Sequence, residues 1–177
     1  DSGGTATLSN IDALDATTTT TIETAMEATQ KQITSHEFTD NMGTTKQYVG
    51  LTEADAENTD TANKYLPFPA IVAGKLLKVA LRSNKNLTGH TLTWRLESIG
   101  AANPNSATPD ILGTQSGAGC NNTTMTTYDF TTGLDDGANA FDASDLVYLS
   151  VQSDTDFGAN VIYYITCLWE HDFSSVG

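Results

Sequence analysis

The stretch that decides the fold is Asn160-Val-Ile-Tyr-Tyr-Ile-Thr-Cys-Leu-Trp-Glu170, in which every second side chain from Val161 to Trp169 is apolar. Three further runs, at residues 74–82, 90–97 and 145–151, alternate apolar and polar side chains in a similar way. Side chains point to opposite faces along a strand, so this spacing predicts strands of a sheet with one buried face.

Further strand signals lie near residues 36–38, 46–51, 64–69 and 124–130. The segment 64–69 contains two prolines, which cannot donate to a ladder, and this places it at a sheet edge. Residues 98–123 are rich in Asn, Pro, Ser and Gly and predict one long irregular loop. The total of about eight strands predicts an all-β fold, an antiparallel β-sandwich of the jelly-roll type.

The predicted core consists of the apolar side chains on the inward faces of the four strongest strands. It is formed by Leu77, Val79, Leu81, Leu92, Trp94, Leu96, Val147, Leu149, Val151, Ile165, Cys167 and Trp169. Cys167 is best interpreted as a small buried hydrophobe. A disulfide between Cys120 and Cys167 is the less favoured alternative, because two cysteines do not make a disulfide framework.

The first 35 residues have a different pattern from the rest, and we predict an N-terminal arm at 1–35 that precedes a sandwich domain at 36–177. Ile22, Met26 and Ile33 recur at helical spacing, which predicts an extended arm with a helix over 22–33. Five consecutive threonines at 17–21 oppose helix formation, because β-branched side chains lose rotamer freedom in a helix. The arm has too few large apolar residues to fold alone, so we expect it to dock on a partner.

The charge balance is strongly acidic, with 22 Asp and Glu against 8 Lys and Arg and a formal net charge of -14. Nucleic-acid binding requires clustered cations to displace counterions from phosphate, and anionic membrane surfaces repel a chain of this sign. No run approaches the roughly 18 apolar residues of a membrane span. We therefore expect neither nucleic acid nor membrane as a partner, and we interpret the charge as a source of solubility.

Candidate catalytic groups do not form a recognisable motif, and we predict no catalytic residues and no enzyme activity. His36, His90 and His171 are far apart and have no metal-ligand spacing, and a Gly-x-Ser-x-Gly elbow is missing. A glycosidase or esterase is the least favoured reading, because it would require a cleft with an acid pair or a triad assembled from distant residues.

The segment Asp154-Thr-Asp156-Phe-Gly158 is the best candidate for a calcium site, since calcium takes loop carboxylates and carbonyls. Hairpin turns favour Asp and Gly for backbone reasons alone, and this is the preferred interpretation. Apart from this calcium candidate, no cofactor is expected. The Asn-x-Thr matches at Asn86, Asn121 and Asn122 are expected by chance in a chain this rich in Asn and Thr.

Four short motifs resemble jelly-roll virion proteins of tailed bacteriophages: Leu66-Pro-Phe-Pro69, the strand Gly74-Lys-Leu-Leu-Lys-Val-Ala-Leu-Arg-Ser83, Phe141-Asp-Ala-Ser-Asp145 and Leu168-Trp-Glu-His-Asp172. The resemblance covers residues 64–172 and has no counterpart for the arm. It implies a non-enzymatic protein at the virion surface, as capsid decoration, head fibre or tail appendage, whose partners are capsid or tail proteins. A glycan-recognition module for host attachment, using the loop at 98–123, is the alternative function.

The final strand is apolar on both faces, which predicts self-association. One face enters the core, and the second face, with Ile162 and Tyr164, needs cover from the arm or from another copy. Together with Ile22, Met26 and Ile33 of the arm, these residues are the predicted partner-binding set. The resemblance implies a homotrimer. The alternative is a monomer whose arm folds back over Ile162 and Tyr164.

Overall fold

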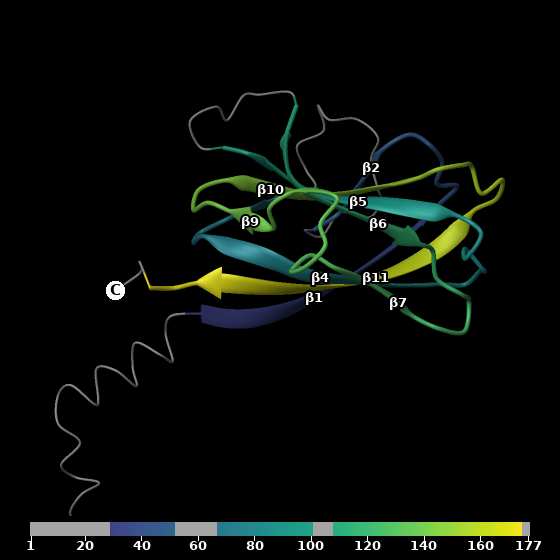
Figure 1. The fold of residues 1–177 in the computed structure, drawn as a ribbon, viewed down its shortest axis with the longest axis horizontal. Coiled ribbons are helices and arrows are strands. Elements are labelled where there is room, and N and C mark those ends of the chain that lie inside the picture. The colour runs from purple at the N-terminus through teal and green to yellow at the C-terminus, as the bar shows by residue number, and fades with distance from the viewer. Residues whose placement is uncertain (1–28, 52–66, 101–107, 175–177) are drawn as a thin grey trace, which may run out of the picture.

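The computed structural model describes residues 29–51, 67–100 and 108–174 (Figure 1). The strands in this part of the chain are β1 Thr29–Asp40, β2 Gln47–Val49, β3 Phe68–Pro69, β4 Gly74–Ser83, β5 Thr91–Ile99, β6 Asp110–Ala118, β7 Thr126–Asp129, β8 Asp136–Gly137, β9 Ala140–Phe141, β10 Leu146–Ser153 and β11 Val161–Asp172. No helix occurs in the described ranges.

The strands form two antiparallel sheets that pack face to face (Figure 1). Sheet A has the order β1-β11-β4-β7, with the short β9 beside β4, and sheet B has the order β2-β10-β5-β6-β8, with β3 beside β10. The chain passes from one sheet to the other between all consecutive described strands except β2 and β3 and except β5 and β6, and β1, the first described strand, pairs with β11, the last. Two antiparallel sheets connected in this way form a jelly roll, which confirms the predicted fold class.

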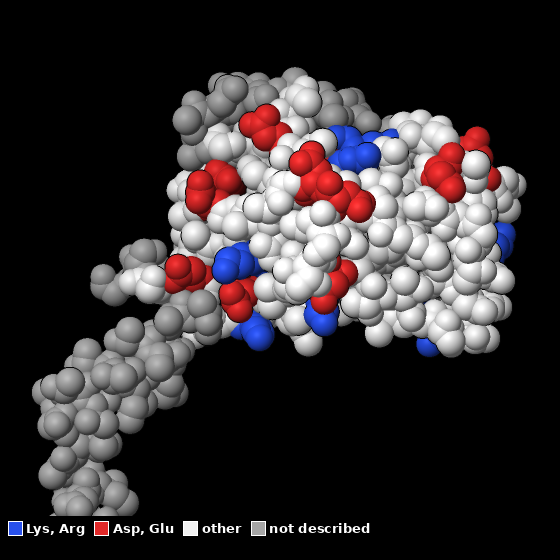
Figure 2. Space-filling model, viewed as in Figure 1, with Lys and Arg blue, Asp and Glu red and all other residues white. Residues whose placement is uncertain are grey.

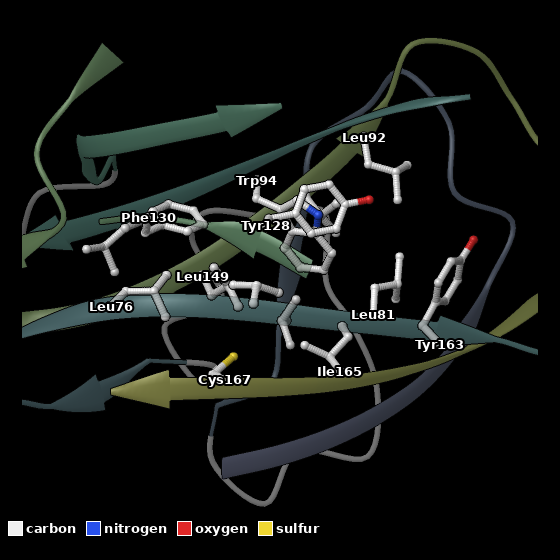
Figure 3. Close-up of a cluster of buried hydrophobic side chains, with 14 of the residues drawn as sticks. Leu76, Leu81, Leu92, Trp94, Tyr128, Phe130, Leu149, Tyr163, Ile165 and Cys167 are labelled. Carbon is white, nitrogen blue, oxygen red and sulfur yellow. The ribbon is translucent and has the colours of Figure 1, made fainter. Parts of the chain in front are cut away.

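The core between the sheets is built from the inward side chains of β4, β5, β10 and β11 (Figure 3). Trp94 is fully buried and its ring lies 5.5 Å from that of Tyr128, while Tyr163 lies 4.7 Å from Phe38. All predicted core residues are buried except Leu77. The alternation of the sequence therefore located this core correctly.

Leu77 was placed in the core by the alternation, and this prediction is wrong. Trp169 of β11 pairs with Leu76, and Leu168 pairs with Lys78, so Leu77 is an extra residue in β4. Such a β-bulge shifts the phase of the alternation along the strand. As a result Leu76 and Val79 both point inward and are fully buried, whereas Leu77 is half-buried.

The irregular loop predicted at 98–123 is also wrong, because this segment contains β6. The inward positions of β6 opposite Leu92, Trp94 and Leu96 are Gly117, Gln115 and Gly113. A Cβ added to Gly117 would lie 3.3 Å from the ring of Tyr128, so large neighbours already fill the space that an apolar residue would occupy. The strand consequently has no apolar alternation by which the sequence could reveal it.

The predicted arm is corrected at its C-terminal end. Residues 29–33 belong to β1, which pairs with β11 from Thr29 opposite Asp172 to Asp40 opposite Val161, so the helix expected over 22–33 is wrong there. The rest of that helix lies outside the described residues. The strand crosses the expected boundary at 35, because the ladder to β11 satisfies its backbone groups and outweighs the helical spacing of its few apolar side chains.

Candidate functional site

The outer face of sheet A, which points away from the core, carries three of the predicted partner-binding residues. The strand register places Ile33 beside Leu168, and Tyr164 between Glu37 and Arg82. Ile33 is 70% exposed and Tyr164 is 43% exposed, whereas Ile162 and Leu168 are half-buried. Ile22 and Met26 lie outside the described residues, so the predicted set is brought together only in part.

Charged side chains flank this apolar stripe. Lys75 lies 3.9 Å from Glu170, and Lys78 lies 3.5 Å from Asp129, both within the outer face of sheet A. Hydrogen bonds from Thr131 are the main cause that lowers the pKa of Asp129, and Lys78 adds to the effect. These are exposed pairs, and pairs of this kind contribute little to stability.

An apolar hollow of about 330 Å³ lies at one end of the sandwich, between β1, β11 and the segment that connects β3 to β4. None of its lining residues is an Asp, Glu, Lys or Arg. The lining consists of Gln32, Thr34, Leu51, Phe68, Pro69, Ile71, Val72, Trp169, His171 and Phe173. Ile71 is 89% exposed, which places a large apolar side chain in water beside an apolar hollow. This hollow could not be predicted from the sequence, because its walls come from four separate segments.

The polar groups of the hollow bond to one another. The indole Nε1 of Trp169 donates to Thr34 Oγ1 at 2.9 Å, and Nε2 of His171 lies 3.1 Å from Gln32 Oε1. The ring of Phe68 packs edge-on against Trp169 with centroids 5.3 Å apart. Burial lowers the pKa of His171, which favours the neutral imidazole. The hollow therefore suits an apolar group better than an ion.

Sheet B carries a buried polar network that was not predicted from the sequence. The carboxylate of Glu97 is fully buried and accepts bonds from Lys46 Nζ at 2.9 and 3.0 Å, from the Tyr48 hydroxyl at 3.0 Å and from Ser150 Oγ at 2.7 Å. Burial and the neighbouring Glu97 raise the pKa of Tyr48. The carboxylate has Lys46, Tyr48 and Ser150 as partners, which is the arrangement of a structural ion pair.

One signal for this network was present in the sequence. The outward positions of β5 and β10 include Ile99 and Tyr148, which are buried and pack with Tyr48 as a second small cluster. The rings of Tyr48 and Tyr148 lie 5.6 Å apart, edge to face. Apolar side chains on both faces of β10 indicated that the outer face of sheet B is also partly covered.

The calcium candidates Asp154 and Asp156 lie in the turn between β10 and β11. The carboxylate of Asp154 accepts a bond from the backbone of Thr91, which is the largest cause that lowers its pKa, and further bonds from Thr155 and Ser153. The carboxylate of Asp156 lies against Gly43. Within the described ranges, no group of three or more His, Cys, Asp or Glu could hold a metal ion.

The three histidines occupy separate positions. His36 lies on β1 and bonds to Thr34 Oγ1 at 3.0 Å, and burial lowers its pKa. Nδ1 of His90 lies 2.9 Å from Thr155 Oγ1 at the opposite end of the sandwich from the hollow that His171 lines. The two cysteines are free and buried, so the alternative disulfide is not formed.

Comparison with known proteins finds similarity in three-dimensional structure at low sequence identity. No protein-family model matches the chain, and no curated protein matches it. The chain is similar to the acidic stable capsid structure of Helicobacter pylori bacteriophage KHP30, at 12% identity and a TM-score of 0.36, over 80% of this chain and 91% of that one. It is also similar to the cyanophage Pam1 capsid asymmetric unit, at 10% identity and a TM-score of 0.39, over 81% of this chain and 86% of that one.

A protein of another kind is similar to the same extent. The CBM22-1 and GH10 modules of Clostridium thermocellum xylanase 10B match at 13% identity and a TM-score of 0.35, over 82% of this chain and 26% of that one. The similar structures thus differ in what they do.

No helix among the described residues is long and apolar enough to cross a membrane.

Proposed function

We propose that this chain is a non-enzymatic structural protein on the outside of a tailed-phage particle, as capsid decoration, head fibre or tail appendage. The observation that carries the proposal is the location of its exposed large apolar side chains. Ile33 and Tyr164 lie on the outer face of sheet A, and Ile71 lies beside the apolar hollow. Exposed apolar groups gathered in this way mark surfaces that contact other proteins. The motifs at residues 64–172 supply the link to phage particles.

The titratable groups support a structural role over an enzymatic one. The most buried carboxylate, Glu97, is held by one cation and two hydroxyls, and Cys167 has its pKa raised by burial to about 12. A thiol with that pKa is a poor nucleophile at neutral pH. The hollow contains no charged carboxylate or amine among its lining residues. These groups stabilise the sandwich and offer no acid–base pair to a substrate.

The N-terminal segment is proposed as the anchor to capsid or tail proteins. Since β1 begins at Thr29 and forms a long ladder with β11, a truncation at residue 35 would remove part of the fold. A truncation of residues 1–28 leaves every described strand intact. We expect that variant to remain folded and to lose its attachment to the particle.

Immunogold labelling of intact phage particles, with antibodies against the purified sandwich, tests the role directly. Regular labelling at one place on the particle supports the proposal, and the place separates decoration, head fibre and tail appendage. Particles that stay unlabelled while unassembled protein is labelled would overturn it. A truncated chain that still binds to particles would remove the anchoring role from residues 1–28.

A glycan-recognition module for host attachment is the second candidate, and the aromatic lining of the hollow favours it. Phe68, Trp169 and Phe173 provide rings, and Gln32 and His171 provide hydrogen-bonding groups. Against it, Trp169 is only 2% exposed, and Gln32 and His171 bond to each other. A glycan array with the purified chain separates the two functions. A specific, saturable sugar signal that is lost in Phe173→Ala would favour recognition.

A further inference from the structure

The outer face of sheet A differs from the rest of the molecule in its charge. It carries four of the chain's eight Lys and Arg, namely Lys31, Lys75, Lys78 and Arg82, by their register in β1 and β4. It carries four of the 22 Asp and Glu, namely Glu37, Asp129, Glu170 and Asp172. The face is thus neutral, whereas the other described residues hold nine Asp and Glu against three Lys and Arg. Figure 2 shows blue and red side chains interspersed on the lower side, where Figure 1 places sheet A.

The contrast between a neutral face and acidic surroundings determines through which surface two copies can approach each other. Through other surfaces, two copies bring like charge together and repel. Through the outer face of sheet A, a neutral surface meets a neutral surface. This face also exposes Ile33 and Tyr164, two of the five large apolar side chains that are exposed in the described part of the chain. Apolar contact and minimal repulsion therefore coincide on one face.

We propose that the outer face of sheet A is the surface through which copies of this chain bind one another. The occupant is a second copy, and the charges beside Tyr164 indicate the geometry. Glu37 lies on the β1 side of Tyr164 and Arg82 on the β4 side. Neither forms an ion pair among the described residues. Two copies can stack through this face when they are related by rotation about an axis parallel to β11. The β1 side of one copy then meets the β4 side of the other, so that Glu37 faces the partner's Arg82.

The two ion pairs within the face are compatible with its being covered. Lys75 and Lys78 have their acids, Glu170 and Asp129, within the same copy, so they remain neutralised when the face is covered. Between the two ends of the stripe, the register aligns Ser35, Thr166 and Ala80, whose small side chains leave the centre flat. A flat centre permits close approach of a second sheet, as in sheet-on-sheet packing.

The mass of the purified full chain, measured by light scattering over a micromolar concentration series, tests the proposal. We expect a multimer for the wild type, whose mass gives the number of copies. Tyr164→Asp and Ile33→Asp place a charge in the contact and should each raise the dissociation constant at least about tenfold. Ile111→Asp is the matched control, since Ile111 is 52% exposed on β6 of the other sheet, and it should leave the mass unchanged.

Charge exchange provides the second test. Glu37→Arg and Arg82→Glu should each weaken association, and the double variant should restore it, because each site again meets an opposite charge. Added salt should leave wild-type association unchanged or strengthen it, because screening reduces the repulsion of the remaining acidic surface. Circular dichroism confirms that every variant is folded.

Several results would overturn the proposal. These are a monomeric wild type, a multimer that survives both Tyr164→Asp and Ile33→Asp, or a multimer that dissociates only when residues 1–28 are removed. The measurement uses the purified chain alone. It is therefore independent of the proposed particle role, which immunogold labelling tests, and either result can fail without the other.

Discussion

Replacement of the buried Glu97 by alanine should strongly destabilise the sandwich, although no proposed function depends on this residue. The side chain accepts four hydrogen bonds from Lys46, Tyr48 and Ser150. Without the carboxylate, the hydroxyls of Tyr48 and Ser150 lose their partner while the residues remain 2% and 0% exposed. A buried donor left unsatisfied costs about 1–3 kcal/mol.

The contribution of Lys46 is smaller, because its side chain is 27% exposed and its amine can turn toward water. The two hydroxyls together with the lost ion pair give an expected loss of roughly 3–5 kcal/mol in the free energy of unfolding for Glu97→Ala. Glu97→Gln keeps one acceptor oxygen and should lose less. In the Glu97→Ala background, Ser150→Ala removes a hydroxyl that has already lost its acceptor. The double variant should therefore lose less free energy of unfolding than the two single variants combined.

Urea unfolding monitored by tryptophan fluorescence measures these losses, because Trp94 and Trp169 are buried and report on the core. Asp136→Ala, an exposed acid on β8, is the control and should change the free energy by no more than about 0.5 kcal/mol. If Glu97→Ala stays within about 1 kcal/mol of the wild type, the network does not stabilise the fold as reasoned.

Three further predictions follow from the core and its titratable groups. Trp94→Ala should lower the free energy of unfolding by about 3–5 kcal/mol, measured by urea titration, and a loss below 1 kcal/mol would contradict full burial of the ring. Burial lowers the folded-state pKa of His36 below its unfolded value of 6.5. The stability that the neutral imidazole contributes is therefore present above pH 6.5 and is lost as the pH falls through the folded-state pKa. His36→Phe should therefore flatten the fall in stability between about pH 7 and 5, and an unchanged slope would refute the assignment. Cys120 and Cys167 should react with a thiol reagent only after unfolding, and fast labelling of the native chain would contradict their burial.

The sequence determined the fold class and most of the core. Alternation in β4, β5, β10 and β11 is a local property that each strand carries in its own residues, and it survives folding because one face of each strand must leave water. The same rule placed Ile162 and Tyr164 on the outer side of β11, where the structure has them half-buried and exposed. The two faces of that strand were thus readable before any neighbour was known.

Only the tertiary structure decided the features that depend on pairing between distant strands. The bulge at Leu77 follows from the register with β11, and β6 is a strand because β5 supplies its ladder and Tyr128 fills the space beside Gly117. The hollow, the Glu97 network and the neutral outer face of sheet A each combine residues from three or more segments. The reason is physical: burial and periodicity act along a strand, whereas cavities, ion networks and net charge of a face depend on which strands become neighbours.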